Sequence, residues 1–403
     1  MTITEEYFNY TAKWKKKYGK KTIVLMQLGQ FYEVYALKNS KGELFGSNIY
    51  EFSRMNDLLI GNKNSKMTGP IKDITESTDT FGVVLAGFGI TQLDKYLERM
   101  DGNGYTIVVY DQDCPGKNTT RSLTEIISPG TYFSPNNTNP TNHTMCIWLE
   151  RSRKKKIFGS QLTIGVSWID IFTGKTNMSQ FTKEYNNNPC TYDELERLVT
   201  IYNPNECILI TNLDEEYLDD IVSYANIYSS KIHKVILNSH TEMAEYAEHA
   251  QRQNYQEKVC NTFFPAMTSD YLMSIFPTHL IAIQSFIFLL DLIYKQNPNL
   301  VKKILFPTIE NSDKRLLLAN HSLQQLNIID EGRHNGRLKS VSDLLNQCLT
   351  AMGKRQFLYN LHNPITDIDE LNNSYNITEY VVDNNRWVSY REISNRIMWT
   401  GFM

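Results

Sequence analysis

Two apolar runs that meet at a glycine dominate the N-terminal part of the chain. Residues 22–28 (TIVLMQL) are apolar and β-branched enough for a strand buried on both faces, and residues 31–37 (FYEVYAL) form a second, aromatic-rich run. Gly29 between them is typical of a bend or of a close approach of two backbones. The pattern therefore predicts two strands joined by a bend at Gly29.

The second run places two unlike side chains on the same face. In an extended chain Phe31 and Glu33 point one way, while Tyr32 and Val34 point the other way. Burying Glu33 without a partner would cost several kcal/mol, so we expect the pair to be exposed together. A ring beside a carboxylate suits a ligand with a stacking face and a hydrogen-bonding edge, such as a nucleic-acid base. The alternative is a core Phe31 beside a solvated Glu33.

A lysine-rich helix precedes these strands. The pattern predicts a helix from about Glu5 to Tyr18, capped by Thr4 and stopped by Gly19. Such a cluster is either a solvated helix end or a set of phosphate contacts, and its closeness to Phe31 in the sequence favours the second interpretation. The lysines at this end are Lys13, Lys15, Lys16, Lys17, Lys20 and Lys21.

The rest of the first 133 residues predicts a mixed sheet flanked by helices. Strands are expected at residues 81–85 and 105–110, and Thr91 with Asp94 predicts a capping box for the helix between them. Residues 63–80 are polar and have the character of an insertion. The two glycines at 87 and 89 lack the spacing of a dinucleotide fingerprint, so packing or turn geometry explains them.

Beyond a linker-like stretch at 134–142, strands alternate with helices. This alternation predicts a compact α/β domain over residues 143–262, with a capping box at Thr191 and Glu194 opening one helix. The expected strands are 145–149, 162–172, 207–211 and 232–237, with helices from 191 to 202 and from 214 onward.

From about Thr241 the apolar positions recur at helical spacing, without a convincing strand, and predict an all-α domain over residues 263–403. Residues 280–294 are too short and too interrupted to span a bilayer and predict a buried helix. Asp367 or Asp369 is expected to cap a later helix. The chain stops at Met403 within a helical pattern, which suggests a fragment of a longer protein.

Four ordered motifs resemble the MutS family of DNA mismatch-repair proteins. Residues 29–35 (GQFYEVY) resemble the family's G-x-F-Y-E element, and residues 83–89 (VVLAGFG) follow at the family's spacing. Residues 127–131 (ISPGT) are similar to its T-P-G-T signature, and residues 340–367 are similar to its core-domain segment. Departures from the commoner bacterial residues at Gln30, Val34 and Tyr35, with the insertion, favour the giant-virus and mitochondrial branch.

The resemblance implies a domain plan. Residues 1–133 would form a mismatch-recognition domain, residues 143–262 a connector with a ribonuclease H-like fold but without that activity, and residues 263–403 an incomplete helical core and lever domain. It also implies a partner, double-stranded DNA with mismatches or small loops, and a homodimer for the full-length protein. ATP and magnesium would belong to the full-length protein, because no G-x-x-x-x-G-K-[ST] sequence occurs in these 403 residues.

The resemblance also implies a mechanism. A mispaired base stacks poorly, so Phe31 would enter the minor groove as an apolar wedge and kink the duplex there. Glu33 would hydrogen-bond the displaced base, either as a carboxylate that repels matched DNA or in a protonated form that donates to a ring nitrogen. The expected DNA-binding residues are Phe31, Glu33, Tyr32, Gly29, Lys15, Lys16 and Lys20.

Composition limits the remaining functions. A net charge of −3 does not favour bulk electrostatic capture of DNA, and six scattered cysteines without C-x-x-C spacing indicate neither zinc nor a disulfide scaffold. We expect a soluble intracellular protein of a virus-infected cytoplasm or a mitochondrion, without a membrane partner, catalytic residues or bound metal. Two alternatives stay open: a junction-binding or structural relative without repair, and a nuclease that uses Asp170, Glu194 and Asp214 as metal ligands.

Overall fold

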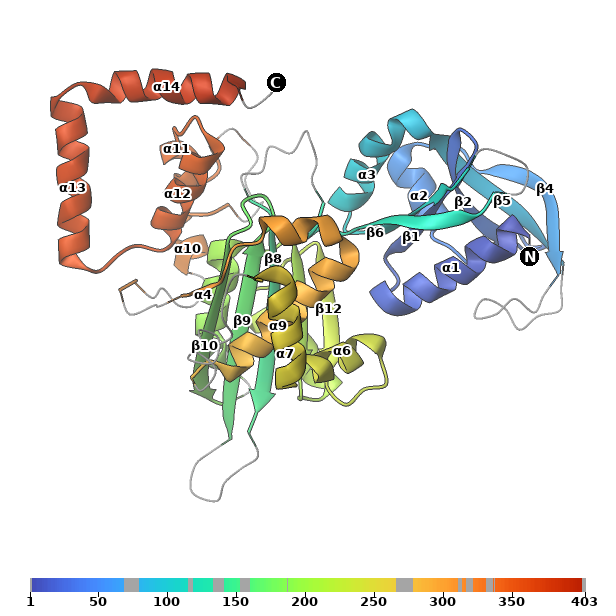
Figure 1. Cartoon of the computed structure of the whole chain (residues 1–403), viewed down its shortest axis with the longest axis horizontal. Helices are drawn as coiled ribbons and strands as arrows, with labels where there is room; N and C mark the ends of the chain where they lie inside the picture. Colours follow the sequence, from blue (N-terminus) through green and yellow to red (C-terminus); the bar gives the residue numbers. More distant parts are fainter. Residues whose placement is uncertain are drawn as a thin grey trace.

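The computed structural model describes residues 2–68, 80–114, 119–132, 141–152, 160–186, 188–265, 278–310, 314–316, 322–330, 336 and 338–400. Two β-sheets with their helices lie side by side, and a further group of helices follows toward the C-terminus (Figure 1). Mixed α/β units followed by helices agree with the fold class that the sequence predicts. Most of the predicted linker, residues 134–140, lies outside the described residues.

The first sheet is mixed. Its strands are β1 (Thr22–Leu28), β2 (Phe31–Lys38), β3 (Leu44–Phe45), β4 (Gly61–Thr68), β5 (Thr80–Gly89), β6 (Thr106–Gln112) and β7 (Arg121–Ile127). They follow the order β4-β5-β2-β1-β6-β7, with β3 beside β2. β1 is antiparallel to β2 and parallel to β6, so the strand that the apolar pattern marks most clearly lies in the interior of the sheet.

Helices cover both faces of this sheet. On one face lies α1 (Ile3–Tyr18), whose Trp14 donates to the Tyr110 hydroxyl at 3.0 Å. On the other face lie α2 (Ile49–Asn56) and α3 (Leu93–Gly102), and the rings of Phe52 and Tyr96 from these helices pack against Phe88 of β5. Alternate residues of β2 therefore enter two different cores.

Several predicted helix starts are wrong in detail. Thr2, rather than Thr4, caps α1, in a capping box with Glu5. The expected box at Thr91 is absent, because a short 3-10 turn over Ile90–Gln92 precedes α3 and no side chain caps the helix. The insertion expected at residues 63–80 contains part of a strand that the sequence did not predict: residues 61–68 form the edge strand β4, which pairs with β5. Residues 69–79 lie outside the described residues.

The second sheet contains β8 (His143–Arg151), β9 (Gln161–Asp170), β10 (Thr176–Glu184), β11 (Glu206–Thr211), β12 (Lys231–Ile236) and β13 (Thr308–Ile309). Their order is β12-β11-β8-β9-β10-β13. One face packs on α4 (Asp193–Tyr202) and α5 (Leu218–Tyr224), and the other packs on α6 (Glu242–Ala250), α7 (Gln253–Phe263) and α9 (Leu280–Gln296). The capping box expected at Thr191 is also wrong, because Pro189–Thr191 form a 3-10 turn and no side chain caps α4.

The buried helix predicted at residues 280–294 is confirmed as α9, which lies directly on the second sheet. A Cβ atom on Gly165 of β9 would lie 2.4 Å from the Ala282 nitrogen, so only glycine permits this approach. Residues 280–296 therefore share a core with the α/β unit, although the sequence assigned them to the all-α domain. The expectation of no strand after Thr241 is wrong, since β13 pairs with β10. No helix among the described residues is long and apolar enough to cross a membrane.

The C-terminal region is helical as predicted. It contains α10 (Ser322–Gln325), α11 (Val341–Leu345), α12 (Ala351–His362), α13 (Ile368–Asp383) and α14 (Arg386–Thr400). Asp367 caps α13 by accepting from the backbone nitrogens of Asp369 and Glu370. α13 and α14 lie apart from both sheets, and α14 runs back from the end of α13 toward the middle of the view (Figure 1). The side chains of Leu344, Leu345 and Met352, expected on a helical stripe, are exposed.

Candidate nucleic-acid interface

The turn between β1 and β2 has the form that the sequence predicts. Leu28 pairs with Phe31 across the two strands, and Gly29 adopts a φ of 58°, a left-handed conformation that favours glycine. The backbone nitrogen of Gly29 donates to Gln112 Oε1 at 3.0 Å, and Arg121 Nε donates to the Gln27 carbonyl at 2.9 Å. The hairpin is thus fixed to β6 and β7 just before Phe31.

Phe31 projects from the end of this hairpin into solvent. Its side chain is 54% exposed, whereas the ring of Tyr32, its chain neighbour, is buried. On the other side of β2, the cross-strand neighbour of Phe31 is Gly89 of β5, which has no side chain to cover the ring. The alternative of a core Phe31 is therefore wrong, and the ring is available to a partner.

Glu33 lies two residues further along the same face and is half-buried. It faces Gly87 of β5, where an added Cβ would lie 2.5 Å from the Tyr32 carbonyl oxygen and 3.2 Å from Glu33 Cγ. Glu33 Oε2 accepts a hydrogen bond from the Tyr35 hydroxyl, and Lys63 Nζ of β4 donates to that hydroxyl at 3.0 Å. We call Phe31, Glu33, Tyr35 and Lys63 the recognition tip.

Tyr32 is not part of this surface. It points to the opposite face of β2, and its hydroxyl donates to Asp111 Oδ1 at 2.7 Å. Burial, together with this hydrogen bond to a carboxylate, raises the pKa of Tyr32 well above its usual value. Of the predicted DNA-binding residues in the hairpin, the structure brings Gly29, Phe31 and Glu33 together and separates Tyr32 from them.

The lysines at the end of α1 are remote from the recognition tip. Lys16 and Lys20 are exposed and Lys15 is half-buried, and burial lowers the pKa of Lys15 while Glu51 partly offsets this effect. They lie where β1 begins, whereas Phe31 lies where β1 ends, so the length of β1 places them about 20 Å apart. Closeness in the sequence was therefore a poor guide to closeness in space.

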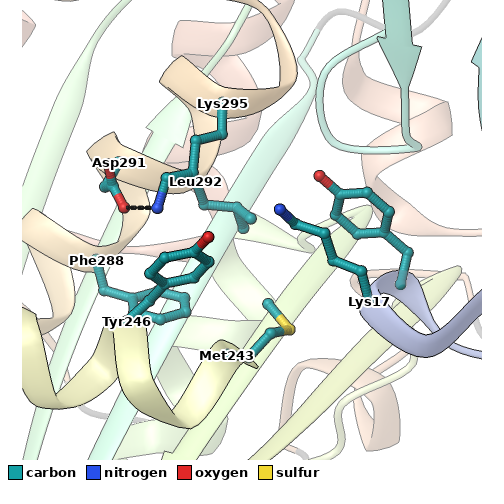
Figure 2. A pocket seen from close by; sticks show the side chains of 8 residues that line it. Lys17, Met243, Tyr246, Phe288, Asp291, Leu292 and Lys295 are labelled. Atoms are coloured by element: carbon teal, nitrogen blue, oxygen red, sulfur yellow. Dashed lines mark hydrogen bonds and ion pairs between the residues drawn. The ribbon is translucent and has the colours of Figure 1, made fainter. Parts of the chain in front are cut away.

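The same end of α1 instead contacts the helices on the second sheet. Lys17 Nζ lies 2.8 Å from Glu242 Oε1 of α6. Figure 2 shows the small pocket beside this pair, where Lys17 faces Tyr246 and Lys295, and Lys295 pairs with Asp291 at 2.6 Å. Lys295 Nζ also lies 3.1 Å from the centre of the Tyr246 ring, a cation–π contact. The ion pair of Lys17 with Glu242 and its contact with the Tyr246 ring therefore connect the first sheet unit to the second.

A buried carboxylate joins the two units more deeply, at the loop that follows β7. Glu206 of β11 is fully buried, and its Oε2 accepts from Ser128 Oγ at 2.5 Å and from the Gly130 nitrogen at 3.0 Å. Its Oε1 lies 2.6 Å from His233 Nε2. A Cβ atom on Gly130 would lie 2.6 Å from Glu206 Oε2, so glycine is required at this position. We call Ser128, Gly130, Glu206, Lys231 and His233 the joint.

The charges of the joint compensate one another. Burial favours a raised pKa for Glu206, but the hydrogen bond and charge of His233, with Lys231 and Ser128, outweigh it and lower the pKa to about 2. Burial lowers the pKa of Lys231 to about 8, partly offset by Glu206, and Lys231 Nζ donates to Thr106 Oγ1 of the first sheet. The sequence analysis did not predict this site. The signal that could have indicated it is Glu206, a charged residue at the start of the otherwise apolar run ECILIT.

The metal cluster that the nuclease alternative requires does not form among the described residues. Asp170 pairs with His143 at the start of β8, whereas Asp214 follows β11, whose end pairs with the end of β8. These two carboxylates therefore lie at opposite ends of the sheet, and Glu194 is 2.9 Å from the Arg197 guanidinium. Within the described ranges no three His, Cys, Asp or Glu side chains are grouped to hold a metal ion.

Comparison with known proteins identifies parts of the chain. The family model of MutS domain II matches residues 142–264, and that of MutS domain III matches residues 321–397. A putative DNA mismatch repair protein mutS homolog of Acanthamoeba polyphaga mimivirus is 27% identical over 95% of this chain and 35% of its own length. A mitochondrial DNA mismatch repair protein mutS homolog of Sarcophyton glaucum is 24% identical over 93% of this chain and 39% of its own length.

A bacterial relative extends the comparison. The DNA mismatch repair protein MutS of Caldanaerobacter subterraneus is 22% identical over 98% of this chain and 40% of its own length. The chain thus spans between a third and two fifths of the length of these curated relatives. The two matching domain models and the relatives that align along nearly the whole chain all come from the MutS family, so the chain is similar to the part of MutS that contains domains II and III.

Proposed function

We propose that this chain recognises mismatched DNA in mismatch repair, with Phe31 as the wedge and Glu33 as the hydrogen-bonding group. The observation that carries the proposal is the exposed Phe31 ring at the end of a hairpin that is anchored behind it. A lone exposed apolar side chain is common on protein surfaces, but here a half-buried carboxylate lies beside it on the same strand face. The similarity to MutS proteins makes a base step of DNA the ligand that we propose.

In this mechanism Phe31 detects how easily the DNA duplex deforms at a base step, rather than which bases form that step. Opening and kinking a duplex costs less at a mispaired or looped-out base, because that base stacks poorly. Insertion of Phe31 from the minor groove would replace lost base stacking by contact with the ring. Glu33 would accept a hydrogen bond from the displaced base, while a matched base, held in its pair, leaves the carboxylate near phosphates without compensation.

The test is a competition assay with Phe31→Ala. The variant should lose the preference for mismatched over matched duplex, by about 1–3 kcal/mol as aromatic stacking on bases is worth elsewhere. Tyr50→Ala is a matched control, because Tyr50 is an aromatic residue of the same sheet unit and is 60% exposed. Equal discrimination by Phe31→Ala and the parent chain would refute the proposal.

The proposal for the complete protein goes further. Because these relatives are between two and a half and three times as long as the aligned part, we propose that the full-length protein binds ATP and magnesium and acts as a homodimer. Lys15, Lys16 and Lys20 remain proposed phosphate contacts, at a site apart from the wedge. Reading the coding sequence beyond residue 403 for G-x-x-x-x-G-K-[ST] tests the nucleotide part directly.

A further inference from the structure

We propose that Gln27 and Gln112 are positioning residues that hold the turn before Phe31 and thereby fix its ring for entry into a base step. This inference rests on the proposed function and assigns a role in it to two side chains outside the recognition tip. Neither side chain has to touch DNA for this role, because each acts through the backbone of the turn.

The two glutamines and Gly29 form a closed cycle of hydrogen bonds, which we call the glutamine brace. The Gly29 nitrogen donates to Gln112 Oε1 at 3.0 Å, and the Gln112 nitrogen donates to Gln27 Oε1 at 2.9 Å. Gln27 Nε2 closes the cycle by donating to the Gly29 carbonyl at 3.1 Å. Both backbone polar groups of Gly29 are therefore held by side chains of the neighbouring strands β1 and β6.

A further hydrogen bond holds the other half of the turn. The Ile90 nitrogen, directly after β5, donates to the Gln30 carbonyl at 3.0 Å. The turn is thus attached to β6 on the side of β1 and to the end of β5 on the side of β2. Because Leu28 pairs with Phe31 across the turn, a change in the backbone of Gly29 and Gln30 would move the base of the Phe31 ring.

Exposure limits what the glutamine brace can contribute to folding. Gly29 and Gln30 are exposed, and Gln27 and Gln112 are half-buried. Water can therefore replace the hydrogen bonds of Gly29 with little loss of stability. Binding gains more from them, because a wedge that is already fixed does not have to be ordered when the complex forms.

The two side-chain amides meet the turn with opposite ends. Gln27 supplies a hydrogen to the Gly29 carbonyl, which can only accept. Gln112 meets the Gly29 nitrogen with its oxygen, while its Nε2 donates to the Thr119 hydroxyl at 3.2 Å. A hydroxyl can donate as well as accept. A carboxylate at position 112 would therefore keep the brace, whereas a carboxylate at position 27 would place two acceptors against each other.

The experiment makes the same substitution, glutamine to glutamate, at both positions. The readout is the ratio of the affinities for a duplex with one unpaired nucleotide and for the matched duplex. Gln112→Glu should keep the ratio of the parent chain. Gln27→Glu should lower it about two- to ten-fold, as the cost of ordering one side chain on binding allows.

Two controls separate positioning from charge and from loss of structure. Both glutamate variants add one negative charge beside the same turn, so their affinities for matched duplex, which the wedge does not enter, should fall alike. Gln112→Met removes the acceptor for the Gly29 nitrogen without adding a charge, and it should lower the ratio as Gln27→Glu does. The thermal unfolding midpoints of all three variants should stay close to that of the parent chain.

The outcomes distinguish the two proposals. A parent chain without preference for the unpaired nucleotide would overturn the proposed function. A parent chain with this preference would overturn only the positioning role if Gln27→Glu and Gln112→Met both kept its ratio. An equal loss of the ratio in Gln27→Glu and Gln112→Glu would assign the effect to the added charge and would also overturn the positioning role.

Discussion

The recognition tip and the joint use the same kinds of groups in opposite ways. At the tip, the Glu33 carboxylate accepts from the Tyr35 phenol, which in turn accepts from the Lys63 ammonium group. Glu33 remains half-buried, and one of its oxygens has no described partner. At the joint, Glu206 is fully buried and both of its oxygens are engaged by Ser128, Gly130 and His233. Glu33 can therefore accept a further hydrogen bond, whereas the hydrogen-bonding groups of Glu206 are taken up within the fold.

This contrast suggests that the joint contributes mainly to the free energy of folding, whereas the tip contributes mainly to the free energy of binding. A buried charge is tolerated only when it is paired and hydrogen-bonded, so the joint must form completely or not at all. The tip can exchange water for a ligand without loss of structure. The joint also connects the two sheet units, because Ser128 and Gly130 follow β7 whereas Glu206 begins β11. It therefore fixes the base from which the tip extends.

The largest expected effect is at the joint. Glu206→Ala leaves His233 and Lys231 buried without their carboxylate, so the free energy of unfolding should fall by about 3–5 kcal/mol. Phe31→Ala and Glu33→Gln at the tip should change it by less than about 0.5 kcal/mol, as is usual for surface substitutions. Urea unfolding of the three variants measures the difference. Similar losses in the free energy of unfolding for the joint variant and the two tip variants would contradict the idea that the joint stabilises the fold and the tip does not.

A second expected effect is a dependence of stability on acid. The pKa of Glu206 is lowered to about 2 from a usual value of 4.5, so its contribution is complete above pH 4.5 and is lost as the pH falls toward 2. The pKa difference corresponds to about 3 kcal/mol. The side chain in Glu206→Gln cannot ionise. The difference in the free energy of unfolding between the parent and this variant should therefore become smaller as the pH falls from 4.5 toward 2. A gap that stays constant between pH 5 and pH 2 would contradict the assignment.

The comparison also explains what the sequence could predict. The hairpin of the tip was predicted with the bounds of β1 and with β2 one residue short, because an apolar run and a glycine at the bend are local signals. Exposure of Phe31 followed from the carboxylate on the same face. The joint escaped prediction because Glu206 meets Ser128 from a position 78 residues away, and no local pattern encodes such a pairing.

The errors have the same origin. The edge strand β4 was not predicted as a strand because it is polar and contributes few apolar side chains, although its backbone pairs with β5. Lys63, which lies on this strand, was therefore not considered beside Glu33. The lysines of α1 were placed near Phe31 because β1 is short in sequence, yet an extended strand of seven residues separates them in space. Local periodicity predicts elements, and only the sheet order shows which side chains meet.

The smallest expected effect concerns the Lys17–Glu242 ion pair, the more exposed of the two contacts between the sheet units. Lys17 and Glu242 are partly exposed, at 17% and 44%, and such pairs are weakened by water and salt. Lys17→Met retains most of the aliphatic chain near the Trp14 and Tyr246 rings, so the free energy of unfolding should fall by only about 0.2–1 kcal/mol. Urea unfolding at low and high salt measures this, and the loss should shrink at high salt. Lys295→Met, which removes the cation on the other side of Tyr246, provides a matched control. A loss from Lys17→Met as large as that of Glu206→Ala would mean that the exposed contact, rather than the buried carboxylate, holds the two units together.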